Sequence, residues 1–166
     1  MRLSVLIGGK AGQGINKISQ IISKIMTKRG YYTFNYRDYP SIIRGGHNFN
    51  VLTISDKRIG SHESKIDFII AMDNNTIKLH KKELRKGGII ISNEQFKDLG
   101  ININVALAGA FIKILGINKT TLITEIKRTL NFKESIKAAE QGFNSQKTKL
   151  NLKQLKNKIT INCGSH

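Results

Sequence analysis

The sequence predicts a single α/β domain of three layers, in which helices cover a mixed, mostly parallel sheet. Three observations support this fold class. A short apolar run, Arg2 to Ile7, precedes a glycine-rich loop and a segment with apolar residues at helical spacing. A continuous apolar run, Asp67 to Met72, is typical of an interior strand of a parallel sheet. Strand and helix patterns then alternate along the chain to about residue 144.

The first half of the sequence predicts a strand, the loop Gly8–Gly14, a helix and further strands. The apolar residues of that helix recur every three or four positions and are Ile15, Ile18, Ile22, Ile25 and Met26. The helix should end near Gly30, because basic residues suit a last turn and glycine suits a helix stop. Residues 31–36 are rich in β-forming side chains. Residues 47–61 predict a hairpin that turns near Asp56 and Lys57.

The second half predicts helices around one further strand. Residues 75–86 have a polar helical pattern that two glycines end, and a strand, residues 89–92, follows. Further helices are expected at residues 105–116, 119–130 and 132–143. Asn131 and Glu134 have the spacing of a capping box at the start of the last helix.

We expect one folded domain, residues 1–144, followed by a polar, basic and loosely attached tail, residues 145–163. A length of 166 residues suits a single domain. The lone cysteine, Cys163, can form neither an internal disulfide nor a cluster site with about four thiolate ligands. Residues 164–166 resemble the remnant of a purification tag. No apolar run approaches the roughly 20 residues of a transmembrane helix, so we expect a soluble, cytoplasmic protein.

The net charge of +17, from 28 Lys and Arg against 11 Asp and Glu, favours a polyanionic partner. Nucleic acid, a phosphate-rich cofactor and an acidic protein surface all qualify. The alternative is a biased base composition, since lysine, asparagine and isoleucine are all abundant. Aromatic residues make up only 7% and form no stacking array, so nucleic-acid binding should be weak and salt-dependent.

The loop Gly8–Gly14, GGKAGQG, offers bare backbone N–H groups at a helix N-terminus, where phosphates commonly bind. Gly9 and Gly14 have P-loop spacing, but Ile15 and Asn16 replace the required Lys-Ser/Thr, so nucleotide hydrolysis is not expected. The dinucleotide spacing is not in register, although Asp38 lies where a ribose-binding acid would sit. Three interpretations stay open: a tight turn only, contact with a phosphate or partner, and NAD-type binding.

The segment YPSIIRGGHNFN, residues 39–50, combines a rigid turn, a cation and two glycines. Pro40 sets the direction of entry, and Gly45 and Gly46 let another group approach the backbone closely. Arg44 suits a carboxylate or a phosphate. The alternative for Arg44 is an ion pair that staples its own loop.

His47 and Ser41 have weaker functional interpretations. His47 could exchange a proton near neutral pH, but no acid or base lies near it in sequence, so a structural hydrogen bond is the alternative. Ser41 suits a cap on the turn. His47, His62 and His80 are isolated from one another in sequence, and no Cys/His set has metal-ligand spacing, so no metal site is expected.

Five motifs follow one another between Arg2 and about Asn144: GKAGQGI, YPSIIRGGHNFNVLTIS, DFIIAMD, LRKGGIIIS and ALAGAFIKILG. Their order and spacing resemble the gamma subunit or domain of 2-oxoacid:ferredoxin oxidoreductases, the pyruvate and 2-oxoglutarate synthase group. The family's usual G-x-G-G-Q-G opening has Ala11 in place of its second glycine here, which indicates that position 11 needs no positive φ. The YPSIIRGGHN form is similar to the variant in which this domain is fused ahead of the alpha subunit.

The resemblance implies a non-catalytic component of a complex that converts a 2-oxoacid, coenzyme A and oxidised ferredoxin into acyl-CoA, carbon dioxide and reduced ferredoxin. It also implies packing on thiamine-binding alpha and beta subunits, a ferredoxin-like delta subunit and a part in the coenzyme A site. The residues assigned to coenzyme A, phosphate or inter-subunit contact are Gly9, Gly12, Gln13, Gly14, Ser41, Arg44, Gly45, Gly46 and His47.

By the same resemblance, thiamine diphosphate, Mg and iron–sulfur clusters belong to the other subunits, since this chain has no Gly-Asp-Gly signature and one cysteine. We expect the chain to bind none of these cofactors and to be inactive alone. Two rival functions remain: a stand-alone dinucleotide-binding domain and a basic nucleic-acid-binding module. Selectivity for the oxoacid side chain is expected in the catalytic subunits.

Overall fold

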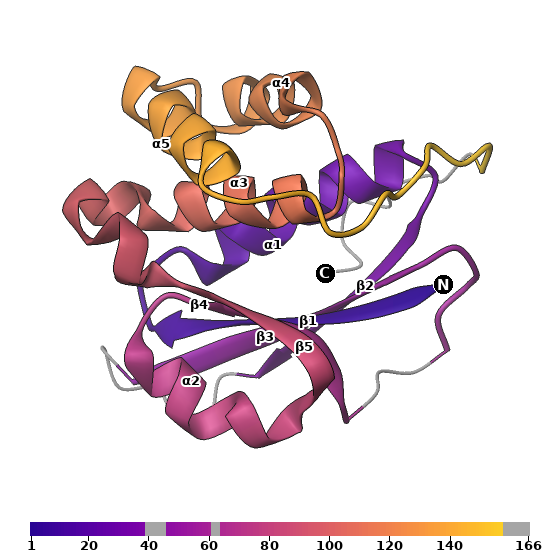
Figure 1. Ribbon diagram of the computed structural model, residues 1–166, viewed down its shortest axis with the longest axis horizontal. Helices are drawn as coiled ribbons and strands as arrows, with labels where there is room; N and C mark the ends of the chain where they lie inside the picture. Colours follow the sequence, from indigo (N-terminus) through magenta and orange to yellow (C-terminus); the bar gives the residue numbers. More distant parts are fainter. Residues whose placement is uncertain (39–45, 61–63, 158–166) are drawn as a thin grey trace.

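The computed structural model describes residues 1–38, 46–60 and 64–157. Its centre is a five-stranded sheet in the order β2-β3-β1-β4-β5 (Figure 1). The strands are β1 (Arg2–Lys10), β2 (Tyr32–Asp38), β3 (His47–Ser55), β4 (Ile66–Ala71) and β5 (Leu84–Ser92). β3 pairs antiparallel with β1 and β2, whereas the β1–β4 and β4–β5 pairs are parallel. Only β3 therefore runs against the other strands, which confirms the prediction of a mixed sheet.

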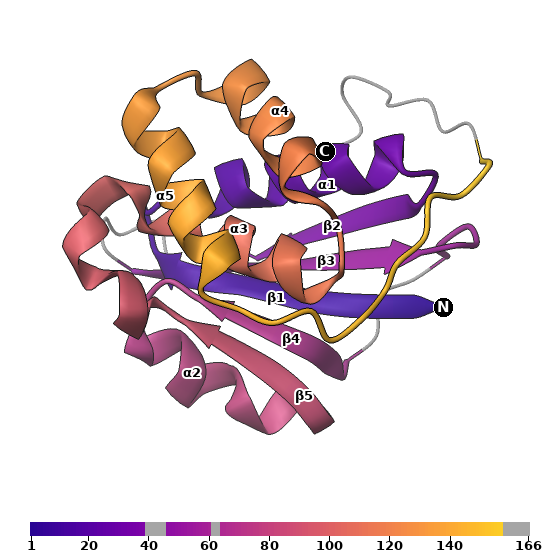
Figure 2. The same cartoon turned by 45° about the horizontal axis from the view of Figure 1, so that its top comes forward.

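Helices cover both faces of the sheet (Figure 1, Figure 2). On one side are α1 (Ile15–Lys28) and α3 (Ile103–Ile114), with α4 (Lys119–Thr129) and α5 (Lys133–Asn144) outside them. On the other side is α2 (Asn74–His80), continued by the 3₁₀ turn η1 (Lys81–Glu83). A second 3₁₀ region, η2 (Asn93–Asn102), is kinked by non-helical backbone at Phe96 and Gly100 and connects β5 to α3. The architecture is the predicted α/β layering, with α4 and α5 as an additional outer pair.

The sheet separates two apolar clusters. The larger lies on the side of α1, α3, α4 and α5 and includes Val5 and Ile7 of β1. The smaller lies on the side of α2 and includes Leu6 of β1 with Val51 and Ile69. β1 contributes to both clusters because successive side chains of a strand point to opposite faces. Covering both faces explains why its sequence is continuously apolar instead of alternating.

Residues 47–61 do not form the predicted hairpin. β3 is one strand, and it pairs on both sides with β1 and β2, so the expected turn near Asp56 and Lys57 does not return the chain along β3. The predicted helix over 75–86 is also too long. It ends at Glu83, and residues 84–88 belong to β5 because Leu84 is already paired with Ile66 of β4.

The predicted capping box before α5 is not formed. Phe132 is the N-cap of α5 and makes no side-chain cap hydrogen bond. Asn131 has a positive φ of 48°, and its backbone N–H donates to the carbonyl of Ile126 at the end of α4. Asn131 therefore terminates α4, as asparagine can in a left-handed conformation.

We call residues 146–157 the strap. The strap has no helix or strand, but the prediction of a loosely attached tail is wrong for it. The backbone N–H of Leu155 donates to the carbonyl of Arg29 at 2.8 Å, and the Tyr31 hydroxyl donates to the carbonyl of Lys153 at 2.8 Å. Strap leucines pack on the larger apolar cluster, namely Leu150, Leu152 and Leu155.

The rest of the predicted tail, residues 158–163, and residues 164–166 lie outside the described residues. The domain boundary at residue 144 stays a prediction. In the described part of the chain, no helix is both long and apolar enough to cross a membrane.

Candidate functional site

The glycine-rich loop lies at the carboxyl end of β1 and leads into α1. Gly12 has a φ of 93°, and Gly14, the N-cap of α1, has a φ of 81°. Both values lie in the left-handed region that glycine adopts without strain. The Gln13 side chain closes the loop, because its Oε1 accepts a hydrogen bond from the Lys10 backbone N–H at 2.6 Å. Gly14, as the N-cap, has no side chain with which to cap the N–H groups of the first turn of α1.

The loop residues differ in how open they are. A Cβ added at Gly9 would collide with Oε1 of Gln13 and with Cβ of Met72. Gly12, in contrast, is exposed, and no described atom lies within 4 Å of the position that its Cβ would take. Ala11 has no positive φ, as predicted. Of these loop residues, Gly12 therefore presents the most accessible backbone to another molecule.

The second predicted segment meets the glycine loop. The backbone N–H of Ala11 donates to the carbonyl of Gly46 at 2.9 Å, and His47, the first residue of β3, is the register partner of Lys10. We call residues 10–14 together with Gly46 and His47 the paired-loop site. Residues 39–45 lie outside the described residues, and with them the predicted positions Ser41, Arg44 and Gly45.

His47 has partners that its sequence neighbours do not reveal. Its Nε2 lies 2.8 Å from Nε2 of His80, the last residue of α2. Nδ1 of His80 in turn lies 2.9 Å from Oε2 of Glu83. The Phe49 ring lies against both histidines, with ring centres 5.9 Å from His47 and 4.5 Å from His80. His47 and His80 are isolated in sequence but not in space, because β3 and α2 bring them together; His62 lies outside the described residues.

A buried amide links the helix of the glycine loop to β3. Asn50 is fully buried, and its Nδ2 donates to Oδ1 of Asn16 and to Oγ of Ser19, both at 3.0 Å. These bonds hold the start of α1 against the strand that carries His47. Sequence reasoning missed Asn50, because an asparagine in a strand does not reveal partners 34 and 31 residues away.

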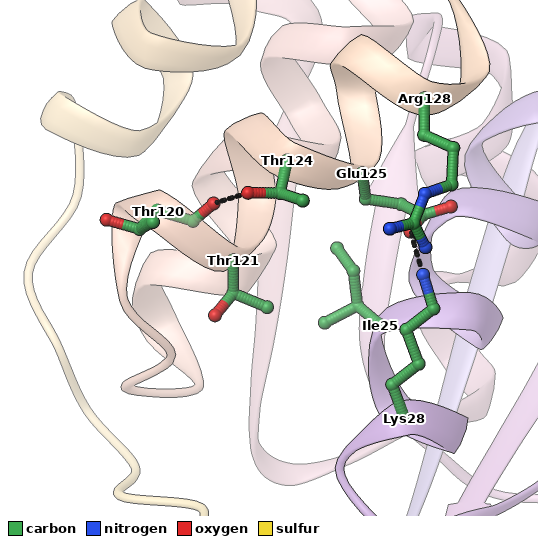
Figure 3. Close-up of a pocket in the computed structure, with 7 residues that line it drawn as sticks. All are labelled: Ile25, Lys28, Thr120, Thr121, Thr124, Glu125 and Arg128. Carbon is green, nitrogen blue, oxygen red and sulfur yellow. Dashed lines mark hydrogen bonds and ion pairs between the residues drawn. The ribbon is translucent and has the colours of Figure 1, made fainter.

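A cavity of about 390 Å³ lies between α1 and α4 (Figure 3). Its lining residues are Ile25, Lys28, Thr120, Thr121, Thr124, Glu125 and Arg128. The buried Glu125 carboxylate accepts from Nζ of Lys28 at 2.8 Å and lies 3.9 Å from Nη1 of Arg128. Lys28 is the last residue of α1, and Gly14 caps the opposite end of the same helix. The length of the helix, about 20 Å, therefore separates this cavity from the paired-loop site.

No cluster of three or more His, Cys, Asp or Glu side chains in the described ranges is arranged to hold a metal ion. The described groups of the paired-loop site are backbone amides, the Lys10 and Gln13 side chains, and His47 with its neighbours His80 and Glu83. Such groups bind anions and exchange protons.

A family model described as pyruvate ferredoxin/flavodoxin oxidoreductase matches residues 4–160. The chain belongs to this family. A member from a Sulfolobus species, 2-oxoacid:ferredoxin oxidoreductase subunit alpha, is 40% identical over 94 residues, which are 57% of this chain and 15% of that protein. Subunit alpha of 2-oxoacid:ferredoxin oxidoreductase 2 from Aeropyrum pernix is 31% identical over 113 residues, 68% of this chain and 18% of that protein. The chain thus spans less than a fifth of the length of these curated relatives.

Solved structures of oxoacid oxidoreductases share the fold. The gamma subunit of keto/oxoacid ferredoxin oxidoreductase from Geobacter sulfurreducens has a TM-score of 0.72 at 19% identity, over 87% of this chain and 95% of that one. The 2-oxoglutarate:ferredoxin oxidoreductase from Magnetococcus marinus has a TM-score of 0.74 at 15% identity, over 87% of this chain and 30% of that one. It was solved with 2-oxoglutarate, coenzyme A and succinyl-CoA bound. The family and fold class predicted from the sequence are confirmed.

Proposed function

We propose that this chain is the gamma-type component of a 2-oxoacid:ferredoxin oxidoreductase, which packs on thiamine-binding subunits and helps form the coenzyme A site. The complex would convert a 2-oxoacid, coenzyme A and oxidised ferredoxin into acyl-CoA, carbon dioxide and reduced ferredoxin. Family membership supports the class of complex. The similarity to a free gamma subunit along 95% of its length, and to a small part of alpha subunits, is compatible with either a separate subunit or a domain of a fused alpha subunit.

The contact between the two loops is the observation that carries this proposal. A hydrogen bond between Ala11 and Gly46 joins them at the carboxyl end of β1, just before α1 begins. Lys10 lies in the first loop, and Lys17 lies in the first turn of α1. Backbone N–H groups at a helix start and nearby cations both stabilise bound phosphate. Coenzyme A carries several phosphate charges, so it is the ligand of the family that this site suits.

The predicted contact residues divide into two groups. Gly12, Gly14, Gly46 and His47 form the described part of the proposed coenzyme A or inter-subunit contact. Ser41, Arg44 and Gly45 would complete it from the segment outside the described residues. Gly9 and Gln13 would support the site indirectly, by shaping the glycine loop. Gly9 leaves room for the Gln13 side chain, and Gln13 closes the loop through its hydrogen bond to Lys10.

In this proposal the alpha, beta and delta partners hold thiamine diphosphate, magnesium and the iron–sulfur clusters. The residues of this chain bind and orient coenzyme A and shield it from water, and they make or break no covalent bond. We therefore expect the isolated chain to be inactive and the complex to work in the cytoplasm.

The sheet order disfavours the dinucleotide alternative. In dinucleotide-binding folds, the strand that precedes the ribose-binding acid lies directly beside the first strand. Here β3 is inserted between β1 and β2. Asp38, the last residue of β2, consequently lies one strand further from the glycine loop than that fold requires.

Affinity purification of the chain from its native cell tests the proposal. We expect a thiamine-binding subunit and a ferredoxin-like subunit to co-purify, and the eluted complex to reduce ferredoxin only when both a 2-oxoacid and coenzyme A are present. Purification of the chain without these subunits would remove the proposed function. Thermal stabilisation by NAD and not by coenzyme A would support the dinucleotide alternative.

A further inference from the structure

The hydrogen bond to Glu83 fixes the position of one hydrogen atom on the His80 ring. A carboxylate can only accept a hydrogen bond, so Nδ1 of His80, which lies 2.9 Å from Oε2 of Glu83, must carry a hydrogen atom. Its side chain is 7% exposed, whereas that of Glu83 is 37% exposed. The buried ring is therefore held in one tautomer by a carboxylate that remains in contact with water. When His80 is neutral, its Nε2 presents a lone pair toward His47.

The contact between the two histidines requires one bridging hydrogen atom. The Nε2 atoms are 2.8 Å apart and the ring centres 5.0 Å apart. The distance between the ring centres is close to the Nε2–Nε2 distance plus the radii of the two rings. Both Nε2 atoms therefore lie nearly on the line that joins the ring centres. Two imidazoles that bind one metal ion would instead point toward a common position off that line. The head-on arrangement is that of an N–H···N hydrogen bond.

This bonding limits how many protons the two rings can hold. With a hydrogen on Nδ1 of His80 and one in the bridge, the pair is neutral if Nδ1 of His47 is bare and carries one positive charge if it is protonated. A second positive charge would place two N–H groups head to head at 2.8 Å and would break the contact. While the contact lasts, the two rings together therefore hold at most one positive charge.

The pair adjoins both loops of the paired-loop site. His47 pairs with Lys10 at the end of β1, and its Cε1 lies 3.4 Å from the position that a Cβ on Gly8 would take. Among the described residues near the pair, the charged ones include Lys10 at the end of β1, Asp73 and Lys78 at the start of and within α2, and Lys81, Lys82 and Glu83 in η1. A proton on the pair offsets the charge of Glu83 and makes the base of both loops more positive.

We propose that His47, His80 and Glu83 form a one-proton unit, in which His80 and Glu83 position His47 and His47 takes up a proton from solvent when a phosphate-bearing ligand binds the paired-loop site. The proton returns to solvent when the ligand leaves. This inference deepens the proposed function and rests on it for the identity of the ligand, but the proton unit itself can be measured without any ligand.

The first test is a pH titration of the full chain, labelled with ¹⁵N-histidine, by NMR between pH 5 and 8. We expect His80 to keep its hydrogen on Nδ1, and His47 and His80 together to take up one proton. Glu83→Gln should shift this uptake to lower pH, because it removes the carboxylate charge that stabilises the cation. The matched control is Glu94→Gln, since Glu94 is an exposed carboxylate paired with Lys97 in η2, and it should leave the titration unchanged. Independent uptake of one proton by each ring, or equal behaviour of the two variants, would overturn the unit.

The second test measures coenzyme A affinity by calorimetry at pH 6 and pH 8, in buffers of different ionisation enthalpy. One linked proton weakens binding by at most about tenfold per pH unit above the titration, so we expect weaker binding at pH 8 and uptake of up to one proton at pH 6–7. His47→Asn and His80→Asn should abolish both effects, and Glu94→Gln should not.

The two parts of the inference can fail separately. Binding of coenzyme A without proton uptake would overturn the inference and leave the proposed function standing. A one-proton NMR titration with no coenzyme A binding at any pH, by the chain or its complex, would instead overturn the proposed function together with the ligand part of the inference.

Discussion

Gly9 and Gly12 stand three residues apart in the same loop, yet glycine is needed at each for a different reason. Gly9 leaves room for the Gln13 side chain and for Met72, whereas Gly12 has a φ of 93° and no described atom within 4 Å of the position that its Cβ would take. At Gly9 glycine is required because a larger side chain would collide with its neighbours, and at Gly12 because the backbone adopts a positive φ. Only Gly12 leaves a backbone surface that a ligand can reach.

We expect Gly9→Ala to lower the free energy of unfolding by about 1–3 kcal/mol, because overpacking forces Gln13 or Met72 to move. Gly60→Ala is the matched control, since nothing described lies within 4 Å of its Cβ position and its φ is not positive. Urea denaturation of both variants measures the difference. Equal stability of the two variants would contradict the packing role of Gly9.

The Lys28–Glu125 pair should respond unequally to the loss of either partner. The Glu125 side chain is 3% exposed and that of Lys28 is 45% exposed. Lys28→Ala leaves the buried carboxylate with the Thr129 hydroxyl and the more distant Arg128 as its described partners, which should cost about 2–4 kcal/mol of the free energy of unfolding. Glu125→Gln leaves a lysine that water can solvate, at a cost of about 1 kcal/mol.

Chemical denaturation of Lys28→Ala, Glu125→Gln and the control Lys24→Ala, a change on the same helix, compares these costs. If Lys28→Ala were no more destabilising than Glu125→Gln, burial of the carboxylate would not be the reason for the pair.

Single residues also show where sequence reasoning about the site stops. The glycine loop and the segment before β3 are visible as motifs, because glycine and proline have strong local conformational preferences. The partners of His47 and Asn50 are not visible, since each lies more than 30 residues away and is brought close only by the sheet. Long-range polar contacts have no local signal of this kind.

At the scale of elements, the strap attaches to the chain mostly through main-chain atoms. Its backbone N–H and carbonyl groups bond to the end of α3, at Ile114 and Leu115, and to the region where α1 ends and β2 begins. Gly30 lies directly beneath it, and a Cβ there would overlap Leu155. Because main-chain bonding does not depend on side-chain type, the polar, lysine-rich sequence of the strap resembles that of an unattached tail.

The Tyr31 phenol, which bonds to the strap, should make the stability of the fold depend on pH in the alkaline range. Burial raises the pKa of its phenol above the usual 10.0, against a smaller lowering effect of Arg29. The folded state therefore holds this proton more tightly than the unfolded state. Its contribution to stability is present below about pH 10 and is lost as the pH rises through the folded-state pKa, where tyrosinate can no longer donate to Lys153.

We expect Tyr31→Phe to lower the free energy of unfolding by about 1 kcal/mol at pH 7 through loss of that hydrogen bond. Its stability should also fall less steeply than that of the parent between pH 10 and 11. Denaturant titrations across this range measure both effects, with the exposed Tyr36 changed to Phe as the control. An identical pH dependence in the parent and Tyr31→Phe would contradict the role of the phenol.

The elements that the sequence predicted well are those with strong apolar periodicity or continuous burial, such as α1, α3 and β4. β5 was predicted only in its apolar half, because residues 85–88 are charged or glycine, and the strand begins at Leu84 through backbone pairing with β4. The hairpin within residues 47–61 was wrong for a related reason. The antiparallel partner of β3 could have been any strand, and its pairing with β1 and β2 is a long-range choice.

At the scale of the whole molecule, the chain folds around two apolar clusters of its own, one on each face of the sheet. Both clusters are completed by residues of the chain itself, as expected of an independent domain. Its net charge of +17 adds a long-range attraction for phosphate-bearing ligands and acidic surfaces. The paired-loop site would then determine where such a ligand binds.

Hydrogen–deuterium exchange of the assembled oxidoreductase, with and without coenzyme A, examines that site in its working context. We predict slower exchange on coenzyme A binding at the amides of residues 10–18 and 46–48, and unchanged exchange in α4, which lines the separate cavity. Unchanged exchange at both loops, with coenzyme A saturating the complex, would show that the paired-loop site takes no part in binding it.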